Sequence, residues 1–179
     1  MEVQEITLLV ATAAGALTDI RTGKIPNALT YPLWVFGAVY ALAGGGRDAL
    51  MDSFGGFAVA FVPCFLLYMS GGLGGGDVKM MAAVGALMGF RFTASVLLTS
   101  IFAGALIAVL IVIWEGRIGV TLKYLGARLF RWGRGPSSEI GAENQVPFGV
   151  AIFLASMVTL IESWHEGRPF FELMTGWMG

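Results

Sequence analysis

Six apolar stretches, separated by short polar connections, constrain most strongly what this chain can fold into. A membrane-spanning helix needs about 20 mainly apolar residues, and the second and fourth stretches are shorter than that. Apolar runs of this length and number predict several crossings of a bilayer. The stretches are Val3–Ile20, Leu29–Ala43, Ser53–Ser70, Val78–Phe90, Thr93–Trp114 and Val146–Ile161.

The composition agrees with a bilayer as the solvent. Of the 179 residues, 56% are hydrophobic and only 13% are charged, which is more apolar surface than a soluble domain of this size can bury. The stretches lack the alternating pattern of barrel strands, so helices are the expected spans. We therefore predict an all-α, polytopic membrane protein with about six transmembrane helices, formed by a single membrane-embedded domain over residues 1–179.

The distribution of Lys and Arg predicts the orientation. With the N-terminus outside the cytoplasm, the inner loops carry eight basic residues and the outer loops carry three, as the positive-inside rule favours. Both termini are therefore expected outside. Because Glu2 and Glu5 lie at the N-terminal end of the first stretch, where a signal peptide has basic residues, we expect that stretch to be retained. The inner residues are Arg21, Lys24, Lys79, Arg117, Lys123, Arg128, Arg131 and Arg134; the outer ones are Arg47, Arg91 and Arg168.

The longest connection, at about residues 115–145, is cytoplasmic in this orientation. Within it, Thr121–Trp132 places three leucines on one helical face and most basic residues elsewhere. This pattern is typical of an amphipathic helix on the inner leaflet, and a solvated connector is an equal alternative.

Several kinds of chemistry lack the residues they need. The single cysteine, Cys64, cannot form an internal disulfide or a cysteine-based zinc site. His165 is followed by Glu166, but Pro169 stands where a zincin has its second histidine, and Ser137 is expected on the opposite side of the bilayer from His165. No basic stripe with aromatic residues indicates nucleic acid. We therefore expect carboxylate, hydroxyl or lysine chemistry, with no metal and no cofactor.

Two acids at the edges of apolar stretches are the strongest candidates for catalysis. Asp19 ends the first stretch in ALTDIRTGKIPN, and Asp77 begins the fourth in GGLGGGDVKM. Both are expected at the cytoplasmic boundary, where two carboxylates can share one proton and activate water for attack on a peptide bond. A single acid at a helix end is usually a cap or an interface residue, and capping is a natural role for Asp77, so the catalytic interpretation depends on the pair. Helix dipoles favour an ionised Asp77 and a protonated Asp19, while Arg21 and Lys24 act in the opposite direction.

The residues before Asp77, GGLGGG, contain five glycines in six positions. Such a segment does not form a stable helix, and it would let an extended substrate approach the backbone closely. A flexible turn is the alternative. The segment lacks the spacing and the Lys-Ser/Thr ending of a phosphate-binding loop.

These motifs together resemble the type IV prepilin peptidases. Gly74-Gly75-Gly76-Asp77 matches the GxGD motif of membrane aspartic peptidases, and GGGDVKMMAA is similar to the prepilin branch. Asp19 before Ile25-Pro26-Asn27 and the PFG element within 146–151 resemble the family's other motifs, in the expected order.

The resemblance implies an inner-membrane enzyme that removes a short basic leader from prepilins on the cytoplasmic side. It assigns the catalytic roles to Asp19 and Asp77. It also implies loop-shaping or substrate-binding roles for Gly74, Gly76, Lys79, Asn27 and Pro147. The partners are then a prepilin and the lipid bilayer, with the oligomeric state left open.

The chain departs from the larger members of that family. It has neither their cytoplasmic insert nor the paired CxxC motifs that accompany N-methylation. We therefore predict cleavage without methyltransferase activity. The compact form and the IPN motif resemble the Flp/Tad-type branch more than the archaeal branch, so a preflagellin is the less favoured substrate.

Two readings from other functional classes remain open. Acids beside glycine breaks also mark ion- or proton-coupled transporters, although transport sites lie near the membrane midplane and often within inverted repeats. A non-catalytic scaffold for pilus assembly would use both acids as caps, and it would tolerate Asn at positions 19 and 77.

Overall fold

The computed structural model describes residues 2–114, 116 and 148–166, and every regular element among them is a helix. The expectation of an all-α fold is therefore confirmed. Pro147 and the segment Thr121–Trp132 lie outside the described residues. The helices are α1 (Val3–Thr22), α2 (Asn27–Met69), α3 (Gly75–Met88), α4 (Phe90–Trp114) and α6 (Phe148–Glu166).

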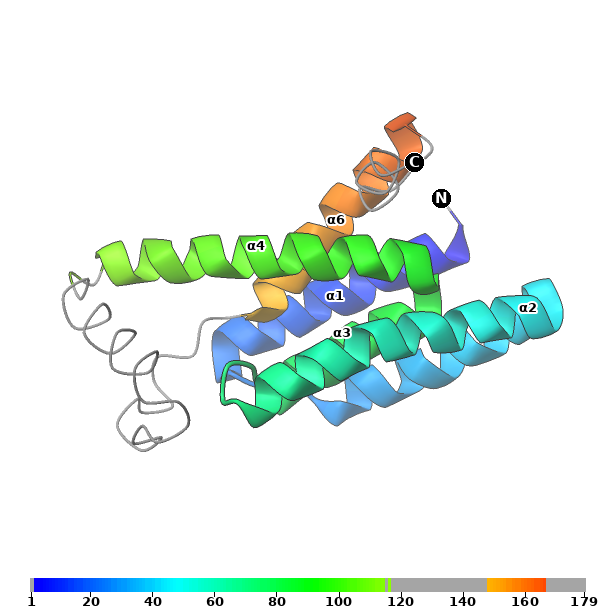
Figure 1. The fold of residues 1–179 in the computed structure, drawn as a ribbon, viewed down its shortest axis with the longest axis horizontal. Helices are drawn as coiled ribbons and strands as arrows, with labels where there is room; N and C mark the ends of the chain where they lie inside the picture. The colour runs from blue at the N-terminus through cyan, green and yellow to red at the C-terminus, as the bar shows by residue number, and fades with distance from the viewer. Residues whose placement is uncertain (1, 115, 117–147, 167–179) are drawn as a thin grey trace.

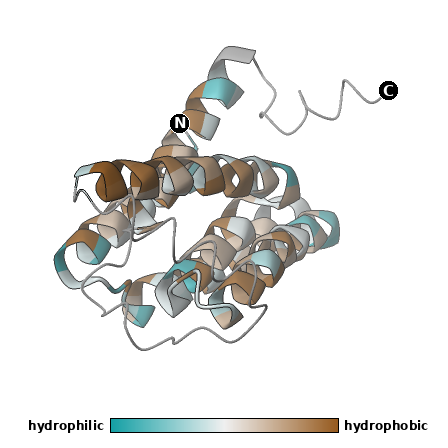
Figure 2. Cartoon of the chain, turned by 60° about the vertical axis from the view of Figure 1, so that its left-hand side comes forward, coloured by the Kyte–Doolittle hydropathy of each residue, from teal (hydrophilic) through white to brown (hydrophobic). Residues whose placement is uncertain are grey.

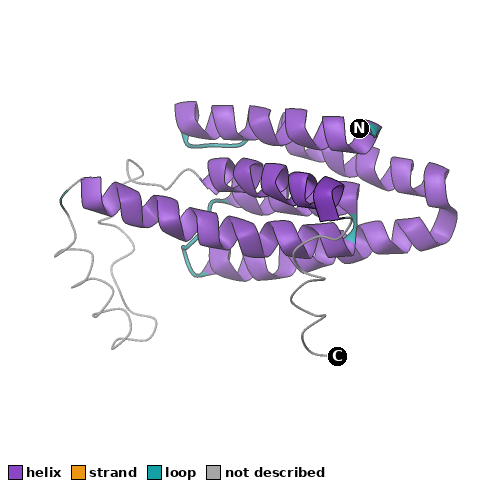
Figure 3. Ribbon diagram, turned by 90° about the horizontal axis from the view of Figure 1, so that it is seen from above, coloured by secondary structure: helices purple, strands orange, loops and turns teal. Residues whose placement is uncertain are grey.

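Helix α2 is a hairpin of two helical arms. Its 43 residues are interrupted at Gly46, whose φ of 64° and ψ of −143° are not helical. Such a positive φ is open to glycine without steric penalty. The arms, residues 27–45 and 47–69, lie side by side in Figures 1 and 3. They correspond to the second and third apolar stretches, and both extend beyond the predicted bounds into the polar and glycine-rich residues around the turn.

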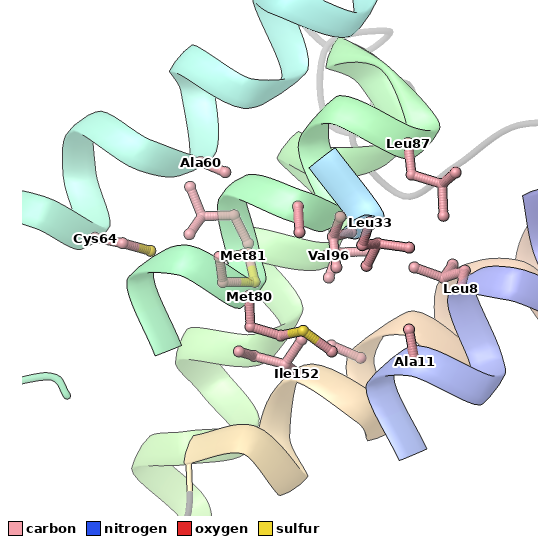
Figure 4. Close-up of a cluster of buried hydrophobic side chains, with 14 of the residues drawn as sticks. Leu8, Ala11, Leu33, Ala60, Cys64, Met80, Met81, Leu87, Val96 and Ile152 are labelled. Carbon is pink, nitrogen blue, oxygen red and sulfur yellow. The ribbon is translucent and has the colours of Figure 1, made fainter. Parts of the chain in front are cut away.

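Helix α3 is short because it lies inside the bundle. Its 14 residues rise about 21 Å, against about 30 Å for a hydrocarbon core. Ten of these residues, Asp77, Val78 and Met80 to Leu87, are buried. Figure 4 shows Met80 of α3, Val96 of α4 and Ile152 of α6 pointing into one cluster of side chains. The fourth apolar stretch is therefore a central helix enclosed by the others.

Small residues let the two arms of α2 approach α3 closely. A Cβ at Gly37 in the first arm would stand 2.6 Å from the carbonyl oxygen of Ala86. In the second arm, Gly56 faces Gly85 backbone to backbone, so that neither position has room for a side chain. Small residues at these contacts therefore let the helix backbones approach closely.

The outer surface is apolar along the long helices, as Figure 2 shows. Large exposed side chains on α4 include Phe102, Leu106 and Leu110. By length and composition α1, α2 and α4 are apolar enough to cross a membrane, and α6 carries a shorter apolar stretch, Phe148–Trp164. These features are those of a membrane protein. The number of six spans stays a prediction.

Candidate active site

The two candidate acids lie at the same end of the bundle. Asp19 is in the last turn of α1, and Asp77 is in the first turn of α3. The C-terminal end of α1 and the turn from α2 into α3 lie on one side of the molecule, to the left in Figure 1. The two acids therefore share one end although they are 58 positions apart in the sequence.

Contacts one helical turn away place the two acids on facing sides of their helices. A Cβ at Gly15 of α1 would stand 3.0 Å from the terminal methyl of Met80 in α3. Asp19 is four residues after Gly15 and Asp77 is three residues before Met80, so each acid shares the face of that contact. The carboxyl groups are close enough for their charges to act on each other. The sequence predicted this convergence.

Asp77 is the more enclosed of the two acids, with 8% of its surface exposed. Its Oδ2 accepts a hydrogen bond of 3.1 Å from the backbone N–H of Gly74. Its Oδ1 is buried and has no hydrogen-bond partner among the described residues. A buried carboxylate oxygen normally has a partner, so this oxygen marks a place for a polar group such as water or a peptide. Asp77 thus combines the capping role with a free oxygen.

Asp19 is half-buried and is held from the opposite end of the chain. Its Oδ2 accepts a hydrogen bond of 2.9 Å from the backbone N–H of Gly149, in the first turn of α6. A Cβ at Gly149 would stand 3.0 Å from both the Cβ and the Oδ2 of Asp19, so only glycine fits without displacing the acid. Both acids therefore face the N-terminus of a helix. The helix dipoles alone therefore do not decide which of the two acids ionises more readily, in contrast to the prediction from the sequence.

The connection that follows Asp19 packs on the turn that carries Asp77. Gly23 ends α1 in the left-handed conformation, with its N–H donating to the carbonyl of Asp19 over 2.7 Å. Ile25 is buried, and a Cβ at Gly76 would stand 3.1 Å from the Cβ of Ile25. This fit assigns Gly76 a packing role that the sequence had described only as loop-shaping.

The remaining predicted site residues are placed as follows. Asn27 and Lys79 are brought together, with Lys79 Nζ donating to Asn27 Oδ1 over 2.8 Å. Gly74 supplies the N–H for Asp77.

The sequence had not singled out Gly15, Met80 or Gly149 as site residues. The glycine of the PFG element was the available signal for Gly149. The described residues hold no group of three or more His, Cys, Asp or Glu side chains placed to share a metal ion.

Comparison with known proteins gives consistent matches. A model described as the type IV leader peptidase family matches residues 6–109. A prepilin leader peptidase/N-methyltransferase of Burkholderia pseudomallei (strain 1026b) is 27% identical over 175 residues, covering 94% of this chain and 48% of that protein. The chain thus spans about half the length of that relative. No solved structure matches.

Two further relatives differ in length and name. The leader peptidase HopD of Salmonella typhimurium is 33% identical over 147 residues, covering 79% of this chain and 81% of that protein. A preflagellin peptidase of Methanococcus maripaludis is 31% identical over 77 residues, covering 41% of this chain and 33% of that protein.

Proposed function

Because the chain belongs to the type IV leader peptidase family, we propose that it is an aspartic endopeptidase that removes the basic leader from Flp-like prepilins. The observation that carries the proposal is the meeting of Asp19 and Asp77 at one end of the bundle, on facing sides of α1 and α3. Two carboxyls that lie close together share a proton more readily than both ionise.

The chemistry needs one ionised and one protonated carboxyl. The ionised group takes a proton from water, whose oxygen attacks the scissile carbonyl carbon. The protonated group donates to the developing oxyanion, and collapse of the tetrahedral intermediate sends a proton to the leaving amine. The unpartnered Oδ1 of Asp77 is the oxygen best placed to meet the water or the carbonyl. The hydrogen bonds from Gly74 and Gly149 hold the two carboxyls in place.

We place the site at the cytoplasmic face of the inner membrane, with both termini outside the cytoplasm. The supporting observation is the excess of Lys and Arg in loops expected on the side of Asp19 and Asp77. Arg21 and Lys24, directly after Asp19, are exposed at that end.

We also propose that the protein cleaves without methylating the product. The chain has one cysteine and cannot form the paired CxxC motifs associated with methylation in larger members. The relative of similar length, HopD, is named a leader peptidase only, whereas the Burkholderia relative named for both activities is about twice as long as its match. The family match does not support the ion-coupled transporter that the sequence left open.

The test is cleavage of a purified Flp-like prepilin by the protein in lipid nanodiscs, read by product mass with S-adenosylmethionine present. The wild type should release the leader and leave the new N-terminus unmethylated. Asp19→Asn and Asp77→Asn should each lower kcat by about a hundredfold or more. Asp48→Asn, an exposed acid beside the α2 hairpin turn, should cleave like the wild type.

Two outcomes would refute this assignment. Full cleavage by either variant at position 19 or 77 would favour acids that act only as caps. A product heavier by one methyl group would refute the proposed lack of methylation.

A further inference from the structure

Lys79 is held by three groups of the first arm of α2. Its ammonium donates to Asn27 Oδ1 over 2.8 Å and lies 5.5 Å from the centre of the Tyr31 ring. Its carbonyl oxygen accepts a hydrogen bond of 2.9 Å from Trp34 Nε1. No carboxylate pairs with this ammonium among the described residues, so its placement rests on an amide oxygen and an aromatic face.

The position of this contact in the chain gives it a role at the site. Asn27 begins α2 and is joined to α1, which carries Asp19, by the short turn 23–26. Lys79 is in the second turn of α3, two residues after Asp77. The Asn27–Lys79 hydrogen bond therefore joins the segment that follows one acid to the helix that carries the other.

A second contact lies on the other side of Asp77. Ile25 packs on Gly76, so the segment 25–27 touches α3 immediately before Asp77 as well as two residues after it. Two contacts that bracket Asp77 fix both the distance and the rotation of its helix relative to α1. Ile25 contributes apolar packing, and the hydrogen bond of Lys79 constrains the orientation of α3.

We propose that Lys79 is a positioning residue, which holds the two acids at reacting distance through its hydrogen bond to Asn27. The inference rests on the proposed peptidase function and assigns Lys79 no contact with substrate. Displacement of a catalytic group by about 1 Å can cost about a hundredfold in rate, so a small movement of α3 is enough to matter.

The kinetic test compares variants on both sides of the hydrogen bond. Lys79→Met keeps the apolar stem, and Asn27→Ala keeps the lysine charge. Each should lower kcat about tenfold or more, with KM changed less than about twofold. The double variant should be no worse than the poorer single variant, because both remove the same contact. Lys79→Arg and Asn27→Asp, which keep a donor and an acceptor, should restore most of kcat.

Arg47→Met is the control for loss of an exposed positive charge, because Arg47 lies beside the α2 hairpin turn and outside these contacts. It should cleave like the wild type. The Trp34 hydrogen bond goes to a backbone oxygen and survives every change at Lys79, so α3 should remain packed on α2.

Cys64 provides a readout that does not depend on cleavage. It is fully buried on the second arm of α2, and Figure 4 shows its sulfur directed toward α3. Labelling by methyl methanethiosulfonate should be slow in the wild type and in Arg47→Met, and about fivefold faster or more in Lys79→Met and Asn27→Ala.

The outcomes separate the two proposals. Faster labelling in both variants supports the positioning role even if the wild type cleaves no prepilin, a result that would remove the proposed function alone. Unchanged labelling together with a raised KM would show that Lys79 binds substrate. A kcat loss in Lys79→Met but not in Asn27→Ala would show that the charge acts without the hydrogen bond. Either of these last two results overturns the inference.

Discussion

The backbone N–H of Gly149 donates a hydrogen bond to Asp19 over 2.9 Å, although 130 residues separate them along the chain. Asp77, in contrast, accepts its hydrogen bond from the N–H of Gly74, the residue directly before its own helix. The hydrogen bond that positions Asp77 is therefore formed within its own segment, whereas the one that positions Asp19 depends on the docking of α6. At the far end of the same helix pair, Trp164 Nε1 donates to Glu5 Oε1 over 3.1 Å, so α6 is tied to α1 at both ends.

Gly149→Ala should impair cleavage without unfolding the protein. The new methyl group would stand 3.0 Å from Asp19 Cβ and Oδ2, which forces the acid or α6 to move. We expect kcat to fall about tenfold or more, since misplacing a catalytic group by about 1 Å is enough to lower the rate strongly. Steady-state kinetics with a prepilin and thermal unfolding by circular dichroism provide the measurement.

Gly44→Ala is the matched control for the alanine at position 149, because a Cβ at Gly44 meets nothing within 4 Å. It should leave cleavage unchanged and should not lower stability, since alanine favours a helix over glycine. Equal kinetics in Gly149→Ala and Gly44→Ala would contradict the role given to Gly149.

Gly56→Ala and Gly85→Ala should both destabilise the bundle. Each Cβ would overlap the backbone of the facing helix, where no flexible side chain can move aside. Overpacking of this kind lowers the free energy of unfolding by about 1–3 kcal/mol. We expect a loss at the upper end of that range, because the clashing neighbour is backbone. Unfolding in a mixed-micelle denaturant series measures the loss. A double variant as stable as either single one would agree with a shared contact, whereas wild-type stability in both would refute it.

Asp52→Ala should lower stability by about 1 kcal/mol and leave cleavage intact. Asp52, on the second arm of α2, accepts a hydrogen bond of 3.2 Å from the N–H of Phe90 at the start of α4. Removing the carboxylate leaves that helix end without this acceptor. Asp52→Asn keeps an acceptor oxygen and should recover most of the loss. Thermal unfolding of the three proteins in nanodiscs gives the comparison.

Cleavage should follow a bell-shaped pH profile. As the pH falls, the remaining carboxylate takes a proton and the base that activates water is lost. As the pH rises, the last proton leaves the pair and the acid that protonates the oxyanion is lost. Measurement of kcat from about pH 4 to about pH 9 covers the ordinary and raised range for carboxyls. Circular dichroism over the same range controls for unfolding, and a rate that stays constant at high pH would contradict a shared-proton pair.

Much of the fold was predictable because apolar length and composition act locally. Asp19 and Asp77 were identified as a pair from their places at the ends of apolar stretches, and the structure brings them to one end of the bundle. The two short stretches had different explanations that length alone does not reveal. The residues 29–43 belong to a longer helical arm, and 78–90 belong to a helix buried by its neighbours.

The contacts that hold the site could not be predicted from the sequence because they join distant segments. Nothing near Asp19 in the chain indicates that the N–H of Gly149 reaches it, or that Asn27 meets the ammonium of Lys79. Hydrophobic pattern specifies which segments leave water, since that free energy depends on composition and area. Directional hydrogen bonds and steric fit between helices depend on their final packing, so only the tertiary structure decided which groups hold the two acids in place.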